Sequence, residues 1–101
     1  MKVLLLRGIN VGGTGKLPMA DLRAILARLG ARDVQTYIQS GNVVFSGDVE
    51  ENALGDAIET DFAFRPRIMI FPADHLHRVA RDNPFDFEPG LLFRMVLERT
   101  R

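Results

Sequence analysis

A glycine-rich segment ending in a lysine is the first stretch whose residue types and spacing could bind a ligand. Gly12, Gly13 and Gly15 can present backbone N–H groups, and Lys16 adds a positive charge. A helix is predicted to begin at Pro18, directly after the segment, and the N-terminus of a helix favours negative charge. Together these features predict a site for an anion such as phosphate or carboxylate. The alternative is a connector that uses its glycines only to turn.

The segment does not match the common nucleotide-binding motifs. A Walker motif would need glycine at position 10 and serine or threonine at position 17, where this chain has Asn10 and Leu17. The dinucleotide-binding pattern also fails, because no three glycines fall at the required offsets. The segment therefore predicts an anion site without indicating which anion.

Arg7 follows the apolar residues 3–6, and this context predicts that its guanidinium is buried. A buried guanidinium needs a carboxylate, backbone carbonyls or a ligand, and an acidic residue of the same chain is the more common partner. Other short polar side chains near predicted strand ends could join Arg7 in one pocket if their loops meet. In the alternative, Ser40 and Asn42 only satisfy the backbone of a turn. The predicted ligand-binding residues are Arg7, Asn10, Gly12, Gly13, Lys16, Gln39, Ser40 and Asn42.

Residue types common in catalytic and metal sites are present, but their spacing does not suit those sites. His75 and His77 are two residues apart, which on a helix places them on nearly opposite faces, so no metal site is predicted. Ser40 lacks the sequence context of a nucleophile and has no evident histidine partner. The acidic residues between 48 and 61 are predicted to face water along a helix. No cofactor is predicted, and the sequence leaves open whether the protein is an enzyme.

The first half of the chain predicts a strand, a helix and a hairpin that would position these residues. Residues 3–7 predict a strand covered on both faces, because the run is apolar without alternation. A helix is predicted over residues 18–29, with an apolar stripe at helical spacing. That stripe consists of Met19, Leu22, Ile25, Leu26 and Leu29. Residues 33–39 alternate polar and apolar side chains and, with 43–45, predict a β-hairpin.

The second half predicts a further helix that ends near Phe62 and a strand over residues 67–71. The inner stripe of this helix would be Leu54, Ala57, Ile58 and Phe62. The resulting order is that of the ferredoxin-like α+β sandwich, in which two helices cover one face of a four-stranded antiparallel sheet. Because the first and fourth strands are apolar on both sides, we expect the other face to need a cover or a second copy of the chain.

Residues 73–101 are predicted to form an extension that follows a ferredoxin-like domain over residues 1–72. Asp74 is expected to cap a short helix, whose apolar residues would be Leu76, Val79 and Ala80. Residues 91–97 predict a fifth strand. The chain ends four residues after this strand, so we expect it to stop near the start of a second α/β region.

The composition is that of one small globular domain in a reducing compartment. A chain of 101 residues with 47% hydrophobic residues supports one modest core and excludes a mainly disordered protein. The absence of cysteine excludes disulfides and thiolate chemistry. No apolar run is long enough for a signal peptide or a membrane helix, which predicts a cytoplasmic protein without a membrane partner.

The charge distribution is compatible with a small anionic ligand but too dilute to indicate a nucleic-acid duplex, and the more common explanation is a dipolar surface that keeps the molecule soluble. The net charge is zero, but residues 1–47 have a net charge of +4 and the remainder −4. Nucleic-acid-binding domains usually have a strongly basic stripe. RNA-binding domains of the predicted fold also stack bases on aromatic side chains of their central strands, where this chain has Ser40, Asn42 and Val44.

Several motifs resemble a bacterial family catalogued as domain of unknown function 1697. They are Arg7 to Gly13, Lys16 to Met19, Tyr37 to Phe45 and Asn83 to Phe85. The resemblance covers most of the chain and implies a ferredoxin-like first domain followed by a second α/β region, so that this chain is similar to a truncated member. The family has no settled activity, so the resemblance implies a fold and no reaction.

Three functions stay open on this basis. The chain could bind a small anionic ligand at the glycine-rich segment. It could instead be an assembly domain that forms a homo-oligomer through an uncovered sheet face. It could also belong to an enzyme whose remaining catalytic groups lie outside these residues.

Overall fold

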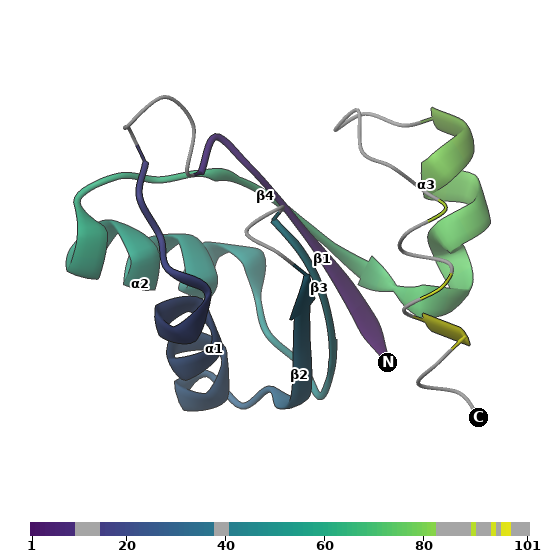
Figure 1. Cartoon of the computed structure of the whole chain (residues 1–101), viewed down its shortest axis with the longest axis horizontal. Helices are drawn as coiled ribbons and strands as arrows, with labels where there is room; N and C mark the ends of the chain where they lie inside the picture. Colours follow the sequence, from purple (N-terminus) through teal and green to yellow (C-terminus); the bar gives the residue numbers. More distant parts are fainter. Residues whose placement is uncertain (10–14, 38–40, 83–89, 91–93, 95, 98–101) are drawn as a thin grey trace.

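In a computed structural model, the chain forms a four-stranded antiparallel sheet with helices on both faces (Figure 1). The structure describes residues 1–9, 15–37, 41–82, 90, 94 and 96–97. The elements, in chain order, are β1 (Lys2–Arg7), α1 (Met19–Arg28), β2 (Arg32–Tyr37), β3 (Asn42–Ser46), α2 (Glu51–Phe62), β4 (Arg67–Pro72), a 3₁₀ turn (Ala73–His75) and α3 (Leu76–Asp82).

The strands lie in the order β2-β3-β1-β4, so β1 and β3 are central. Leu5 of β1 is opposite Asn42 on one side and Met69 on the other. The strand order and the succession β1 α1 β2 β3 α2 β4 confirm the predicted ferredoxin-like fold. Because β1 ends beside the start of β3, the loop after β1 and the β2–β3 turn leave the same end of the sheet.

The first face of the sheet is covered by α1 and α2, as predicted. Leu4 and Leu6 of β1 point to this face and lie in the main core cluster. The helices contribute their predicted apolar stripes, and the members of those stripes that are in the buried class are Leu22, Ile25, Leu26, Leu54 and Ile58. Helical spacing of apolar residues therefore located this half of the core correctly.

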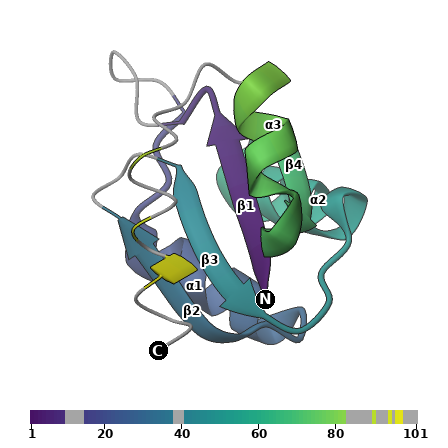
Figure 2. The ribbon, with the colours of Figure 1, turned by 90° about the vertical axis from the view of Figure 1, so that its right-hand side faces the viewer.

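The second face is covered from within the chain, which is one of the two kinds of cover that the sequence left open. Val3, Leu5 and Val44 are at most 1% exposed, and they form a second cluster with Leu76 of α3. Figure 2 shows α3 on the opposite side of the sheet from α1 and α2. The short helix predicted after residue 73 is confirmed by α3, and its apolar side packs against the sheet.

Two details of the C-terminal region differ from the prediction. The turn before α3 has Pro72 at its N-terminal cap position and no side-chain cap hydrogen bond, so Asp74 does not cap it. Arg94, Val96 and Leu97 are helical, so the predicted strand over residues 91–97 is wrong at each described position. A short apolar run without alternation fits a buried helix as well as a strand, which is why periodicity failed here.

Among the helices that the structure describes, none combines the length and apolar content that crossing a bilayer would require.

Candidate functional site

The two residues that flank the glycine-rich loop, Gly8 and Gly15, lie close together beside the end of β1. A Cβ atom built on Gly15 would lie 2.5 Å from the backbone oxygen of Gly8. Gly15 also has a φ of +61°, a conformation that L side chains rarely adopt. Only glycine therefore permits this close approach, which closes the base of the loop over residues 9–14. Loops whose ends are held together in this way frequently have functional roles.

The turn between β2 and β3 contacts the same end of β1. The backbone N–H of Leu6 donates a hydrogen bond to the carbonyl oxygen of Gly41, at 2.8 Å. A Cβ atom on Gly41, whose φ is +77°, would lie 2.5 Å from the carbonyl oxygen of Leu6. The described ends of these two loops therefore lie at the same end of the sheet.

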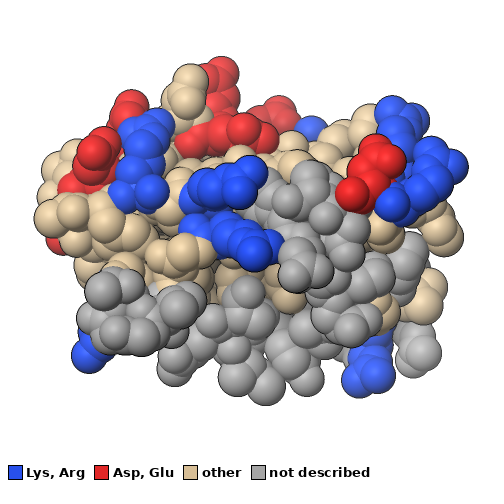
Figure 3. Space-filling view, turned by 90° about the horizontal axis from the view of Figure 1, so that it is seen from above, with Lys and Arg blue, Asp and Glu red and all other residues tan. Residues whose placement is uncertain are grey.

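Two arginines lie side by side at this end. Arg7, the last residue of β1, is directly opposite Arg67, the first residue of β4. Both are exposed, so the prediction of a buried Arg7 is wrong. By strand alternation both side chains share the sheet face of Leu5 and Met69, which is the face that α3 covers. Figure 3 views the molecule from the side on which β1 ends and shows Lys and Arg side chains together near the middle of that surface.

Asn42 adds a polar group beside the arginine pair. It is 6% exposed and is the one polar residue of the described chain in the buried class. Since Asn42 is opposite Leu5, it lies diagonal to Arg7, at a separation that long side chains can span. A buried amide requires hydrogen-bond partners, so this position is suited to orienting a polar neighbour.

The remaining predicted residues divide between the described and undescribed parts of the chain. Lys16 is exposed and directly follows Gly15 at the base of the loop. The other predicted site residues lie outside the described residues: Asn10, Gly12, Gly13, Gln39 and Ser40. Sequence reasoning missed Arg67, although the predicted topology contained the signal. In the ferredoxin-like order β4 runs antiparallel to β1, so its first residue must lie beside the last residue of β1.

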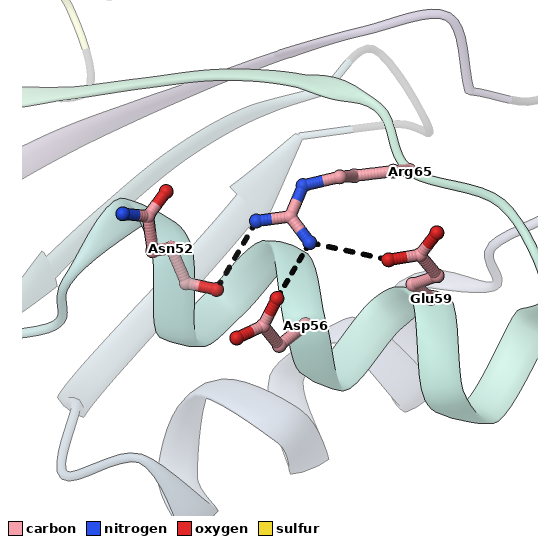
Figure 4. A network of polar contacts seen from close by, with 4 residues as sticks. All are labelled: Asn52, Asp56, Glu59 and Arg65. Carbon is pink, nitrogen blue, oxygen red and sulfur yellow. Dashed lines mark hydrogen bonds and ion pairs between the residues drawn. The ribbon is translucent and has the colours of Figure 1, made fainter.

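A separate polar cluster joins α2 to the segment before β4 (Figure 4). Arg65 Nη1 donates to Asp56 Oδ1 at 2.6 Å and to Glu59 Oε1 at 3.3 Å, while Nη2 donates to the carbonyl oxygen of Asn52 at 3.4 Å. The hydrogen bond to Asp56 is the main cause that raises the pKa of Arg65 above its usual value. All partners of this guanidinium belong to one helix, and the cluster therefore fixes a loop to α2.

Other features of the described part of the chain give less support for a functional site. No group of three His, Cys, Asp or Glu side chains gathers there in a way that could hold a metal ion. His75 Nε2 lies 3.9 Å from the carboxylate of its neighbour Asp74. An open hollow of about 510 Å³ lies at the opposite end of β1, lined by Met1, Lys2, Pro72, Ala73, Asp74 and Val96.

Comparison with known proteins identifies a family without assigning a reaction. The profile of the family described as "Protein of unknown function (DUF1697)" matches residues 1–97. The chain therefore belongs to this family. It is 36% identical to the conserved bacterial protein SP0830 from Streptococcus pneumoniae, whose structure it matches with a TM-score of 0.59 over 79% of this chain. The match covers 47% of SP0830, so this chain spans about half the length of that protein. No curated protein matches the chain.

Proposed function

We propose that this member of the DUF1697 family binds a small anionic ligand at the end of the sheet where β1 finishes. The observation that supports the proposal is the direct pairing of Arg7 with Arg67, next to the buried Asn42. Lys16 stands at the base of the adjoining glycine-rich loop. The site would also include the predicted residues of that loop and of the β2–β3 turn, namely Asn10, Gly12, Gly13, Gln39 and Ser40.

Electrostatics explains why this pairing favours an anion. Like charges directly opposite each other on neighbouring strands destabilise the pair. A negative group beside Arg7 and Arg67 offsets part of this like charge and can accept a charge-assisted hydrogen bond from a guanidinium group. Because both side chains are exposed, the interaction is screened by salt, and we expect binding to weaken as ionic strength rises.

An assembly role through the sheet has less support. The face proposed for assembly is filled by the contacts of Val3, Leu5 and Val44 with Leu76, and these residues are at most 1% exposed. A homo-oligomer would therefore have to use another surface or displace α3. Measurement of molecular mass at increasing protein concentration distinguishes this role from ligand binding.

An amide-resolved NMR titration of the chain with inorganic phosphate and with acetate tests the proposal. We expect shifts in the amides of residues 6–9, 15–16 and 41–42 with at least one of the two anions. The variant Arg7→Ala should remove these shifts and keep a dispersed spectrum. Arg32→Ala is the matched control, because Arg32 is also exposed but lies at the opposite end of the sheet. Equal titration of wild type and Arg7→Ala would refute the proposed site.

A further inference from the structure

We infer that Asn42 makes this site specific for an anion that also has a primary carboxamide group. The inference rests on the proposed function, because it specifies the ligand class of the same site. It comes from the burial of the Asn42 side chain and from the neighbours that the strand register gives it.

Asn42 is a buried polar residue beside an apolar cluster. It lies opposite Leu5 on β1 and opposite Tyr37 on β2, and only 6% of it is exposed. Cross-strand partners project to the same face, and Leu5 belongs to the cluster that Leu76 of α3 completes. Within the described part of the chain, no hydrogen bond joins the Asn42 side chain to another group. Such an amide has lost its hydrogen bonds to water without a replacement, which is costly.

A primary carboxamide on the ligand is the complement of this side chain. The Asn42 amide has an acceptor oxygen, Oδ1, and two donor hydrogens on Nδ2. A carboxamide has the same two groups, so that one N–H···O hydrogen bond can form in each direction. A carboxylate accepts from Nδ2 but leaves Oδ1 unpaired, because it has no hydrogen to donate. Since so little of Asn42 is exposed, the group that reaches it must also be small, as a carboxamide is.

The register places this amide at a suitable separation from the proposed anion site. Leu5 is opposite Asn42, and Arg7 is two residues further along the same face of β1. Diagonal neighbours of this kind are about 7–8 Å apart. A small ligand with a carboxamide at one end and a negative group at the other can therefore contact Asn42 and lie beside the end of β1.

The same reasoning makes a prediction for the chain without ligand. An amide that has no partner until the ligand binds lowers the stability of the free chain. Leucine has a similar size and would join Leu5 and Val44 without burying a polar group. Asn42→Leu should therefore raise the Tm of the free chain. A lower Tm, or failure to fold, would overturn the inference, because the amide would then already have a stabilising partner.

The binding test is an NMR titration of the whole chain with succinamate and with 4-oxopentanoate at pH 7.5 and equal ionic strength. These monoanions differ only in the terminal group, which is NH2 in succinamate and CH3 in 4-oxopentanoate. We expect succinamate to bind about tenfold more tightly, because the ketone leaves Oδ1 of Asn42 unpaired. In Asn42→Leu the two ligands should bind equally. Arg32→Ala should keep the preference of the wild type, because Arg32 lies at the opposite end of the sheet.

The outcomes separate this inference from the proposed function. Equal affinity of the wild type for the two ligands would overturn the inference and leave a site for anions in general, as would a preference for succinamate that persists in Asn42→Leu. Shifts near residues 6–9, 15–16 and 41–42 with inorganic phosphate but not with succinamate would overturn it in the same way. If none of the three probes shifts these amides, the proposed function itself is refuted, and the inference with it.

Discussion

Gly55 stands in the middle of α2, where glycine ordinarily weakens a helix, and a single neighbour explains its presence. A Cβ atom at this position would lie 2.7 Å from Cζ and from Nη2 of Arg65. The guanidinium therefore rests on the helix backbone, within reach of Asp56 and Glu59. Since the pKa of Arg65 is raised, its guanidinium stays charged below the pKa of an unfolded arginine and pairs with Asp56 and Glu59 while those carboxylates are ionised. The contribution of Arg65 to stability is lost as the pH rises through the folded value.

Two substitutions combined in a double-mutant cycle should reveal this contact. In the background of Arg65→Ala, Gly55→Ala should raise the free energy of unfolding by about 0.5–1 kcal/mol, the usual gain for alanine over glycine in a helix. In the wild-type background the gain should be smaller, because the new methyl group displaces the guanidinium from Asp56 and Glu59. Urea unfolding of the four proteins measures both values. Equal gains in the two backgrounds would show that Arg65 and Gly55 are not coupled.

At the same scale, the sequence identified part of the candidate site and misjudged its environment. Arg7 was recognised because a cation ends an apolar run, but its exposure depends on where the sheet stops, which the strand sequence does not state. Arg67 was missed because it is one of several surface arginines until the register places it opposite Arg7. The proximity of Gly41 to Leu6 likewise comes from a tertiary hydrogen bond, which no local pattern contains.

Among the elements, β4 is an edge strand in which one outward N–H group is hydrogen-bonded to α2 and another is absent because the residue is proline. The backbone N–H of Ile70 donates to Glu51 Oε2 of α2 at 2.8 Å. Pro72, two residues further along the same edge, has no N–H to offer. Unpaired edges can template pairing with other chains. Glu51, in the first turn of α2, thus hinders the pairing of another strand with the middle of the β4 edge.

Glu51→Ala should open this edge. We expect a loss of about 1 kcal/mol in the free energy of unfolding, typical of an exposed charge-assisted hydrogen bond, and a fall in Tm of about 4–8 °C. Hydrogen exchange of the Ile70 amide should accelerate more than that of Met69, whose N–H faces β1. Glu51→Gln is the control, because it keeps an acceptor oxygen and should retain most of the protection. Unchanged exchange at Ile70 in Glu51→Ala would contradict this role.

The elements themselves were largely predictable from the sequence because their patterns are local. The stripe of α1 at three- and four-residue spacing and the alternation through Val34 and Thr36 gave the correct types and faces. The register shift in β2 between Arg32 and Gln35, where Asp33 has a φ of 52°, was not predictable. Aspartate tolerates this left-handed conformation, but nothing in the alternating pattern marks it as a bulge. Residues 91–97 failed for a related reason, since packing decides the conformation of a short apolar run.

The whole molecule has two apolar cores, one on each face of a single sheet. Leu4 and Leu6 face α1 and α2, while Val3 and Leu5 face α3. Each central strand is therefore buried on both sides, which explains why β1 does not alternate polar and apolar residues. The second core is the smaller one, and among the described helices α3 contributes its one side chain in the buried class, Leu76.

Leu76 should consequently contribute both to the stability of the chain and to keeping the second face of the sheet from self-association. Leu76 is 1% exposed and packs among Val3, Leu5, Val44 and Phe71. Leu76→Ala should lower the free energy of unfolding by about 2–4 kcal/mol, a large part of the roughly 5–15 kcal/mol of an ordinary domain. Loosening of α3 would also expose apolar sheet surface, so we expect the apparent mass in light scattering to rise with protein concentration.

Arg78→Ala, on the exposed side of α3, should change the free energy of unfolding by less than about 0.5 kcal/mol. If the free energy of unfolding of Leu76→Ala falls by less than about 1 kcal/mol and its apparent mass matches that of the wild type, α3 is not the element that covers the second face.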